Sequence, residues 1–153
     1  MLFETLGDWQ NPAILFFHAM GVTGASSKPV AQYLKDSYFC ILPTSTVYCE
    51  GQKYLSKVDE VRQIEDFLQK ENVKDLACVV ASSIGADLAM AFLSQTKRPV
   101  GHVFFDGGQF ARIGKATRRF MTPFLYLAIK SLYLSKGGTL KRILWCDDDA
   151  IKP

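Results

Sequence analysis

Histidine is scarce in this chain, with only 2 such residues, His18 and His102, among 153. Any site that needs an imidazole as a base must use one of these two positions or take the group from elsewhere. The 4 cysteines show neither metal-ligand spacing nor a disulfide framework. We therefore expect no metal site and no cofactor, and a reducing cytoplasm is the natural setting for such free thiols.

Long apolar runs and strong charge are also missing. The best candidate for a membrane span is interrupted by Lys130, and the first residues lack the basic start and apolar core of a signal peptide. The formal net charge is only +3, and no nucleic-acid-binding module is recognisable. These features exclude a membrane-spanning protein and argue against a nucleic-acid partner.

What the chain does contain is an alternation of short apolar runs with segments of helical periodicity. The runs are too short for helices and are apolar on both faces, which is typical of strands in a parallel sheet covered by helices on both sides. An amphipathic helix is expected over residues 58–68, and another begins near Pro29. The sequence therefore predicts the α/β class, in one soluble domain with a sizeable core. The expected strands are residues 13–17, 38–43, 76–81 and 100–105.

The segment 81–85, Ala-Ser-Ser-Ile-Gly, follows the third expected strand and opens a helix. This order places the Ser83 hydroxyl on a sharp strand-to-helix turn, beside backbone N–H groups that have no intrahelical partner. Such N–H groups can stabilise an oxyanion. The pattern is a nucleophile elbow of the G-x-S-x-G type, with Ala81 in place of the first glycine. An ordinary strand–helix junction also contains Ser and Gly, so the motif alone leaves both interpretations open.

Three polar or glycine-containing features follow expected strands and should meet at one edge of the sheet. The loop 18–24 follows the first strand, Ser83 follows the third and Asp106 follows the fourth. Ligands of open α/β sheets bind at the carboxyl ends of the strands. We therefore expect the functional site at this edge.

With these residues the chain resembles the α/β-hydrolase family. The resemblance is carried by residues 16–21, by the elbow at Ser83 and by residues 103–107, and it covers roughly residues 10 to 110. It implies that Ser83 is the nucleophile and that the N–H groups of Met20 and Ile84 form the oxyanion hole.

The resemblance also makes Asp106 a candidate for the triad acid, because some family members place the acid after this strand. The favoured alternative is that Asp106 caps its own loop by bonding the N–H of Gly108 or Gln109. His18 fits the oxyanion-loop position, where we expect its ring to be hydrogen-bonded to backbone. His102 is expected inside a strand, as a satisfied polar residue.

Family members carry the triad acid and histidine in later strands, which these residues do not include. Without an imidazole base, serine is a weak nucleophile. Three explanations stay open: a piece of a longer hydrolase, a shortened relative that has lost the chemistry, or a second chain that supplies the base. The first two are favoured.

The charge differs between two parts of the chain. Residues 1–108 hold 9 Lys and Arg against 12 Asp and Glu, whereas residues 109–153 hold 9 against 3. We divide the domain into an incomplete core, 1–110, and a helical cap segment, 111–153, with one or two helices bent near Pro123. The cap's apolar side is expected to rest on the core. Alternatives are recognition of anionic or acyl-chain substrates and, less favoured, attachment to a membrane surface.

The sequence therefore favours a serine hydrolase acting on carboxylic ester or related acyl substrates through Ser83, if a base is supplied from outside the chain. The alternative is a non-catalytic remnant that works as a binding or regulatory module. The strand 100–105 should leave a sheet edge uncovered, with Val103 and Phe105 on one face and Phe104 on the other. Self-association through that edge is a further expectation.

Overall fold

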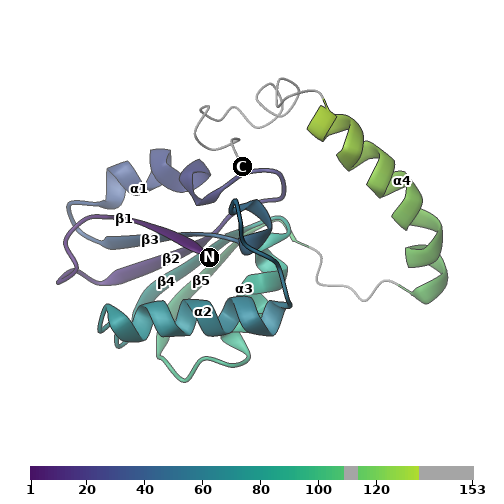
Figure 1. The fold of residues 1–153 in the computed structure, drawn as a ribbon. Helices are drawn as coiled ribbons and strands as arrows, with labels where there is room; N and C mark the ends of the chain where they lie inside the picture. The colour runs from purple at the N-terminus through teal and green to yellow at the C-terminus, as the bar shows by residue number, and fades with distance from the viewer. Residues whose placement is uncertain (109–113, 135–153) are drawn as a thin grey trace.

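In the computed structural model, residues 1–108 and 114–134 are described. They form a sheet of five strands in the order β1-β3-β2-β4-β5, flanked by helices (Figure 1). The strands are β1 (Leu2–Leu6), β2 (Ala13–Phe17), β3 (Phe39–Thr44), β4 (Leu76–Ser82) and β5 (Val100–Asp106). The α-helices are α1 (Lys28–Leu34), α2 (Lys57–Lys70), α3 (Gly85–Leu93) and α4 (Lys115–Leu134), with short 3-10 turns η1 (Gly24–Ser27) and η2 (Thr46–Tyr48).

The order of connections decides which face each helix covers. The step from β2 to β3 through α1 runs in one direction across the sheet, and the steps through α2 and α3 run in the other. Because such crossovers are right-handed, the reversal places α1 on one face and α2 with α3 on the opposite face. Figure 1 shows this three-layer arrangement. It confirms the predicted α/β class with helices on both sides.

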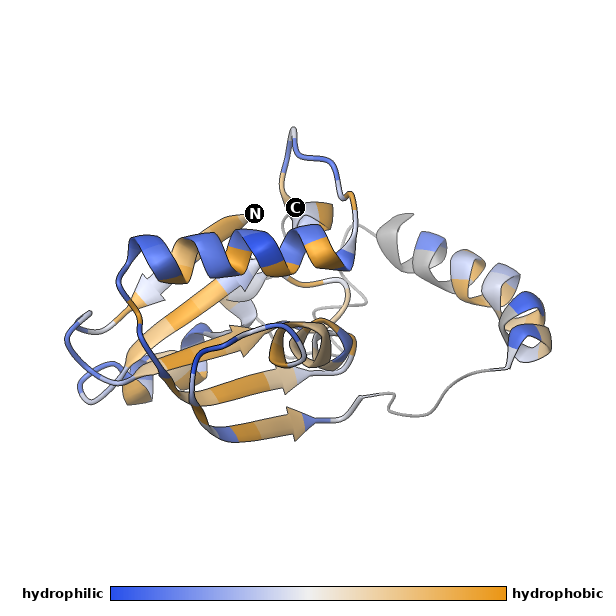
Figure 2. Ribbon diagram, turned by 90° about the horizontal axis from the view of Figure 1, so that it is seen from below, coloured by the Kyte–Doolittle hydropathy of each residue, from blue (hydrophilic) through white to orange (hydrophobic). Residues whose placement is uncertain are grey.

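The core lies on both faces of the sheet, because the strands are apolar on both sides. Figure 2 shows the strands as mostly hydrophobic, whereas the outward side of α2 is hydrophilic. Phe92 of α3 is fully buried and packs on Phe17 of β2, with ring centroids 5.9 Å apart. The cluster under α1 is smaller: Ile14, Phe16, Ala31, Cys40 and Leu42. The larger cluster, under α2 and α3, includes Leu15, Phe17, Ile41, Val61, Ile64, Leu68, Leu76, Val79, Ala86 and Phe92.

The four strands expected from the sequence are confirmed and pair in parallel, but the sheet is not purely parallel. The strand β1 was not predicted, and it pairs antiparallel with β3 at the edge. Phe3 of β1 stacks on Phe67 of α2, with ring centroids 4.0 Å apart. This contact joins residues far apart in the chain, which explains why the short stretch Leu2–Leu6 carries little local signal.

The opposite edge, β5, pairs only with β4 among the described strands. Phe104 on one face is 61% exposed and Val103 on the other is 42% exposed. Among the described residues no strand pairs with the outer side of β5, as the sequence predicted. Self-association through it stays a prediction.

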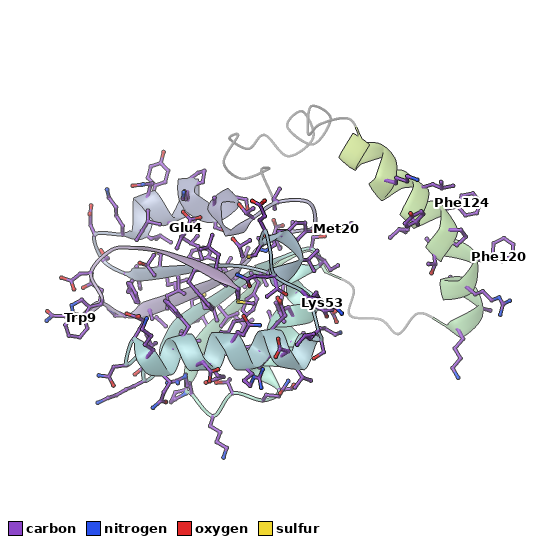
Figure 3. The ribbon with its side chains drawn as sticks, viewed as in Figure 1. Glu4, Trp9, Met20, Lys53, Phe120 and Phe124 are labelled. Carbon is purple, nitrogen blue, oxygen red and sulfur yellow. The ribbon has the colours of Figure 1, made fainter. Side chains whose placement is uncertain are left out.

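The helix α4 confirms the helical prediction for part of the cap segment. Over residues 115–134 it is one continuous helix, with Pro123 in its interior. The apolar side chains that the structure describes between residues 120 and 127 are exposed, and Figure 3 shows Phe120 and Phe124 directed away from the sheet and its helices. These described side chains do not show the expected packing on the core, and the role of a cap stays a prediction. The predicted end at residues 137–138 lies outside the described residues.

Within the described ranges, none of the helices combines the length and apolar content that crossing a bilayer requires.

Candidate active site

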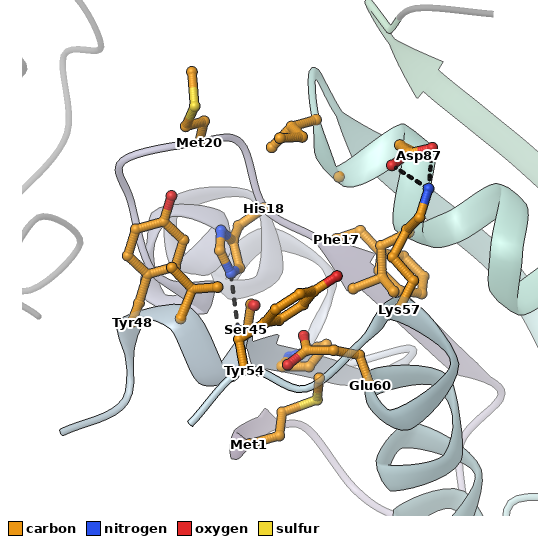
Figure 4. A pocket seen from close by; sticks show the side chains of 15 residues that line it. Met1, Phe17, His18, Met20, Ser45, Tyr48, Tyr54, Lys57, Glu60 and Asp87 are labelled. Carbon is orange, nitrogen blue, oxygen red and sulfur yellow. Dashed lines mark hydrogen bonds and ion pairs between the residues drawn. The ribbon is translucent and has the colours of Figure 1, made fainter. Parts of the chain in front are cut away.

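A pocket lies where the connections of the sheet change direction, at the carboxyl ends of β2 and β4. The chain leaves β2 toward α1 on one face and leaves β4 toward α3 on the other, which opens a crevice between them. The pocket has a volume of about 500 Å³ and is shown in Figure 4. It is lined by Met1, Phe17, His18, Met20, Pro43, Ser45, Val47, Tyr48, Tyr54, Lys57, Glu60, Ile84, Gly85, Asp87 and Leu88.

Ser83 stands on the turn between β4 and α3 in a left-handed conformation, with φ of 51°. This region disfavours residues with a side chain and costs about 1 kcal/mol. Two backbone hydrogen bonds stabilise this strained conformation. The Ser83 N–H donates to the carbonyl oxygen of Asp106 at 3.0 Å, and the Ser83 carbonyl oxygen accepts from the N–H of Ala86 at 3.1 Å. Ser83 is exposed and is not itself a lining residue of the pocket, but Ile84 and Gly85, which follow it directly, are.

Gly85 lets the first turn of α3 approach β2 closely. A Cβ at this position would lie 2.5 Å from the carbonyl oxygen of Phe17 and 2.6 Å from that of His18. Only glycine fits this contact between backbones. The second glycine of the elbow motif is therefore explained by packing. Ala81, at the motif's first position, is fully buried in β4 between Phe17 and Phe105, so the extra methyl group is accommodated there.

Met20 and Ile84 come from separate loops but line the same pocket. Within the described part of the chain, neither backbone N–H donates to an acceptor. The loop that carries Met20 is fixed at its next residue, since the Gly21 N–H donates to the Tyr48 hydroxyl at 2.8 Å. An oxyanion hole requires such unpaired amides, and the assignment of Met20 and Ile84 to it stays a prediction.

His18 uses both ring nitrogens to hold this loop. Its Nδ1 lies 2.8 Å from the carbonyl oxygen of Ala19, and its Nε2 accepts from the N–H of Ser45 at 3.1 Å. This pattern requires a neutral ring that carries its proton on Nδ1. Burial lowers the pKa of the His18 imidazole, while the bond to Ala19 and the Glu60 carboxylate oppose that shift. The prediction that His18 is bonded to backbone is confirmed, and no nitrogen is left to act as a base.

The other two polar candidates lie on β5 and do not line the pocket. His102 is exposed in mid-strand, opposite Cys78, and its ring makes no hydrogen bond to a described residue. Asp106 ends the strand with an exposed side chain, and it contributes to the elbow through its carbonyl. The expected bond from Gly108 to its carboxylate is not formed, and Gln109 lies outside the described residues.

Sequence reasoning missed the charged side chains of the pocket. Glu60 is 1% exposed, while Lys57 and Asp87 form an ion pair with distances of 2.9 and 2.8 Å across its wall. The signal for Glu60 was its spacing, because Glu60, Ile64 and Leu68 recur every four residues on the buried face of α2. No cluster of three His, Cys, Asp or Glu suited to a metal occurs among residues 1–108 and 114–134.

Known structures share this architecture. An α/β-hydrolase family protein from Desulfitobacterium hafniense superposes with a TM-score of 0.69 and 20% identity, over 78% of this chain and 49% of that chain. A carboxylesterase of Nitrososphaera gargensis gives a TM-score of 0.65 at 14% identity, over 84% and 48% of the two chains. A thioesterase domain from the curacin biosynthetic pathway gives 0.63 at 21% identity, over 82% and 48%. The chain therefore has part of the α/β-hydrolase fold.

The described fold corresponds to part of those structures, since the chain spans about half the length of the relatives it matches. No protein-family model and no curated protein matches the sequence.

Proposed function

We propose that this chain carries the nucleophile and oxyanion hole of a serine hydrolase that acts on a carboxylic ester or related acyl compound. The observation that carries the proposal is the left-handed Ser83, held at the end of β4 by bonds on both sides of its backbone. It stands next to a pocket that Met20 and Ile84 line, and the backbone N–H groups of these two residues have no acceptor among the described residues. The hydrolase names of the similar structures support a general hydrolase function.

The proposed reaction has two steps. The Ser83 hydroxyl oxygen attacks the substrate carbonyl and passes its proton to a base, and the oxyanion that forms is held by the Met20 and Ile84 N–H groups. The leaving alcohol departs with the proton from the base, which leaves an acyl ester on Ser83. Water then attacks that ester with help from the same base, releases the acid and restores the hydroxyl.

The base comes from outside these 153 residues. His18 has both nitrogens engaged, and His102 is in mid-strand away from the pocket. Asp106 is retained as the candidate acid on the basis of its place after β5, one strand from the serine. A base from a further part of a longer hydrolase, or from a second chain, would complete the site.

A second candidate function is a binding or regulatory module that uses the same pocket without chemistry. The lack of an available imidazole favours it. The pocket and its free amides would then bind an acyl group or a carboxylate.

Labelling with a fluorophosphonate probe separates the two. An activated serine reacts at Ser83, so labelling should vanish in Ser83→Ala and persist in Ser82→Ala, a matched neighbour in β4. The probe is applied to the chain alone and to the chain in extract, where a partner can supply the base. Equal labelling of the two variants, or none under either condition, would refute the hydrolase and leave the binding module.

A further inference from the structure

Glu60 is a buried carboxylate with one oxygen unpaired. Its Oε1 accepts hydrogen bonds from the backbone N–H of Thr46, at 2.9 Å, and from the Thr46 hydroxyl. Its Oε2 has no hydrogen-bond partner among the described residues. Figure 4 shows the Glu60 carboxylate beside Tyr54 and Ser45 in the pocket. An acceptor in this position is costly unless something pairs with it.

The cations near the pocket do not supply that partner. The ammonium group of Lys57 bonds both carboxylate oxygens of Asp87, and no ion pair in the described chain includes Glu60. The imidazole of His18 is neutral and engaged on both sides. The N-terminal ammonium group of Met1, which also lines the pocket, donates to the side-chain oxygens of Gln52 and Gln63. Both positive groups therefore have other partners, and Glu60 has no cation bonded to it among the described residues.

The rest of the wall is mainly apolar. Phe17, Met20, Ile84 and Leu88 contribute hydrocarbon or aromatic surface, and the volume of about 500 Å³ suits a small organic molecule. A ligand that fits this wall needs an apolar body and one group that can pair with a carboxylate. An ammonium group satisfies both the charge and the free lone pairs of Oε2.

We propose that Glu60 is a specificity-determining residue that binds the primary ammonium group of an amino-substituted acyl ligand in this pocket. The assignment of the ligand as an acyl compound rests on the proposed function. The contact between Glu60 and the ammonium group concerns binding only and does not depend on that function. Glu60 is held in place by Thr46, so the carboxylate is positioned before the ligand arrives.

The test compares two probes that differ in one group, phenylbutylamine and phenylbutanol. Each is titrated into the full chain, and binding is followed by calorimetry and by the NMR amide resonance of Thr46. The amine should bind about tenfold more tightly than the alcohol and should shift the Thr46 resonance, because the ligand meets the same carboxylate. Equal binding of the two probes, or binding of neither, would overturn the proposal.

Two variants of one helix complete the test. Glu60→Gln keeps an acceptor for Thr46 but removes the charge, and it should lower the affinity for the amine about tenfold while leaving that for the alcohol unchanged. Glu65→Gln, on the same helix but paired with Arg98 away from the pocket, should change neither. If Glu60→Gln does not fold, the comparison of probes on the unaltered chain decides.

The two proposals fail separately. Amine preference without labelling of Ser83 would retain the ammonium site and refute the hydrolase. Labelling without amine preference would retain the hydrolase and refute the role of Glu60.

Discussion

The Ser83 N–H donates to the carbonyl oxygen of Asp106 at 3.0 Å, and this bond joins the elbow to the end of the neighbouring strand. It extends the β4–β5 ladder, in which Ser82 lies opposite Asp106, by one residue beyond β4. The bond fixes the serine backbone at the point where its φ turns positive. The main chain of Asp106 therefore positions Ser83 independently of its side chain.

Asp106→Asn is expected to leave the elbow intact, because the bond to Ser83 uses only backbone atoms. The carboxylate is exposed, so the free energy of unfolding should change by less than about 0.5 kcal/mol. Chemical denaturation measures this change. If Asp106 is also the acid of the completed site, probe labelling of Ser83 will fall in the same variant while stability does not. A large loss of stability would contradict the backbone role.

Ser83→Gly should raise stability by about 1 kcal/mol, because glycine adopts the left-handed conformation at 51° without a steric penalty. The same change removes the proposed nucleophile and should abolish labelling. Thermal and denaturant unfolding measure the first effect. Ser82→Gly, in the regular part of β4, should instead destabilise the chain. If both variants lose stability, Ser83 is not strained.

Gly85→Ala should destabilise the chain by about 2 kcal/mol, because the new methyl group would lie 2.5 Å from the carbonyl oxygen of Phe17. The start of α3 must then move away from β2, which displaces the Ile84 amide and should reduce labelling of Ser83. Gly114→Ala is the control, since its nearest neighbour would be the Thr117 hydroxyl at 4.0 Å. Equal stability of the two variants would show that the close approach is unimportant.

Stability should fall on acidification because of His18. Burial keeps the folded-state pKa of this imidazole below 6.5, its ordinary value, so the unfolded chain binds more protons as pH falls. The contribution is complete above about pH 6.5 and is lost as the pH falls toward the lowered pKa. His18→Gln does not titrate in this range and should flatten the dependence, whereas His102→Gln, at an exposed site, should not. Denaturation at several pH values measures how the free energy of unfolding depends on pH. If this dependence is unchanged in His18→Gln, His18 is not its cause.

Local patterns predicted the four parallel strands, because each is a short run that is apolar on both faces. The helix α2 was also predicted, over residues 58–68, although Val58 at the start of that range is 63% exposed. Glu60, two residues further along the helix, is buried instead of Val58. Helical spacing from Ile64 and Leu68 indicates this position, yet a charged residue is normally assigned to the solvent side. The pairing with Thr46 that makes its burial tolerable is visible only in three dimensions.

The candidate site shows the same division. The elbow was predicted because glycine, serine and a change of periodicity occupy adjacent positions. The bond between His18 and Ser45, the support of Gly21 by Tyr48 and the edge strand β1 were not, because each joins segments well separated in the chain. Local sequence patterns therefore do not indicate such contacts.

The sequence alone determined that strands alternate with helices and that Ser83 lies on a turn between them, since both follow from the spacing of apolar and small residues along the chain. Only the tertiary structure decided that Met20, Ile84 and Glu60 share one pocket and that His18 is neutral within it. The reason is physical: spacing selects local backbone geometry, whereas charge pairing and access to a ligand depend on which distant segments the packed core brings together.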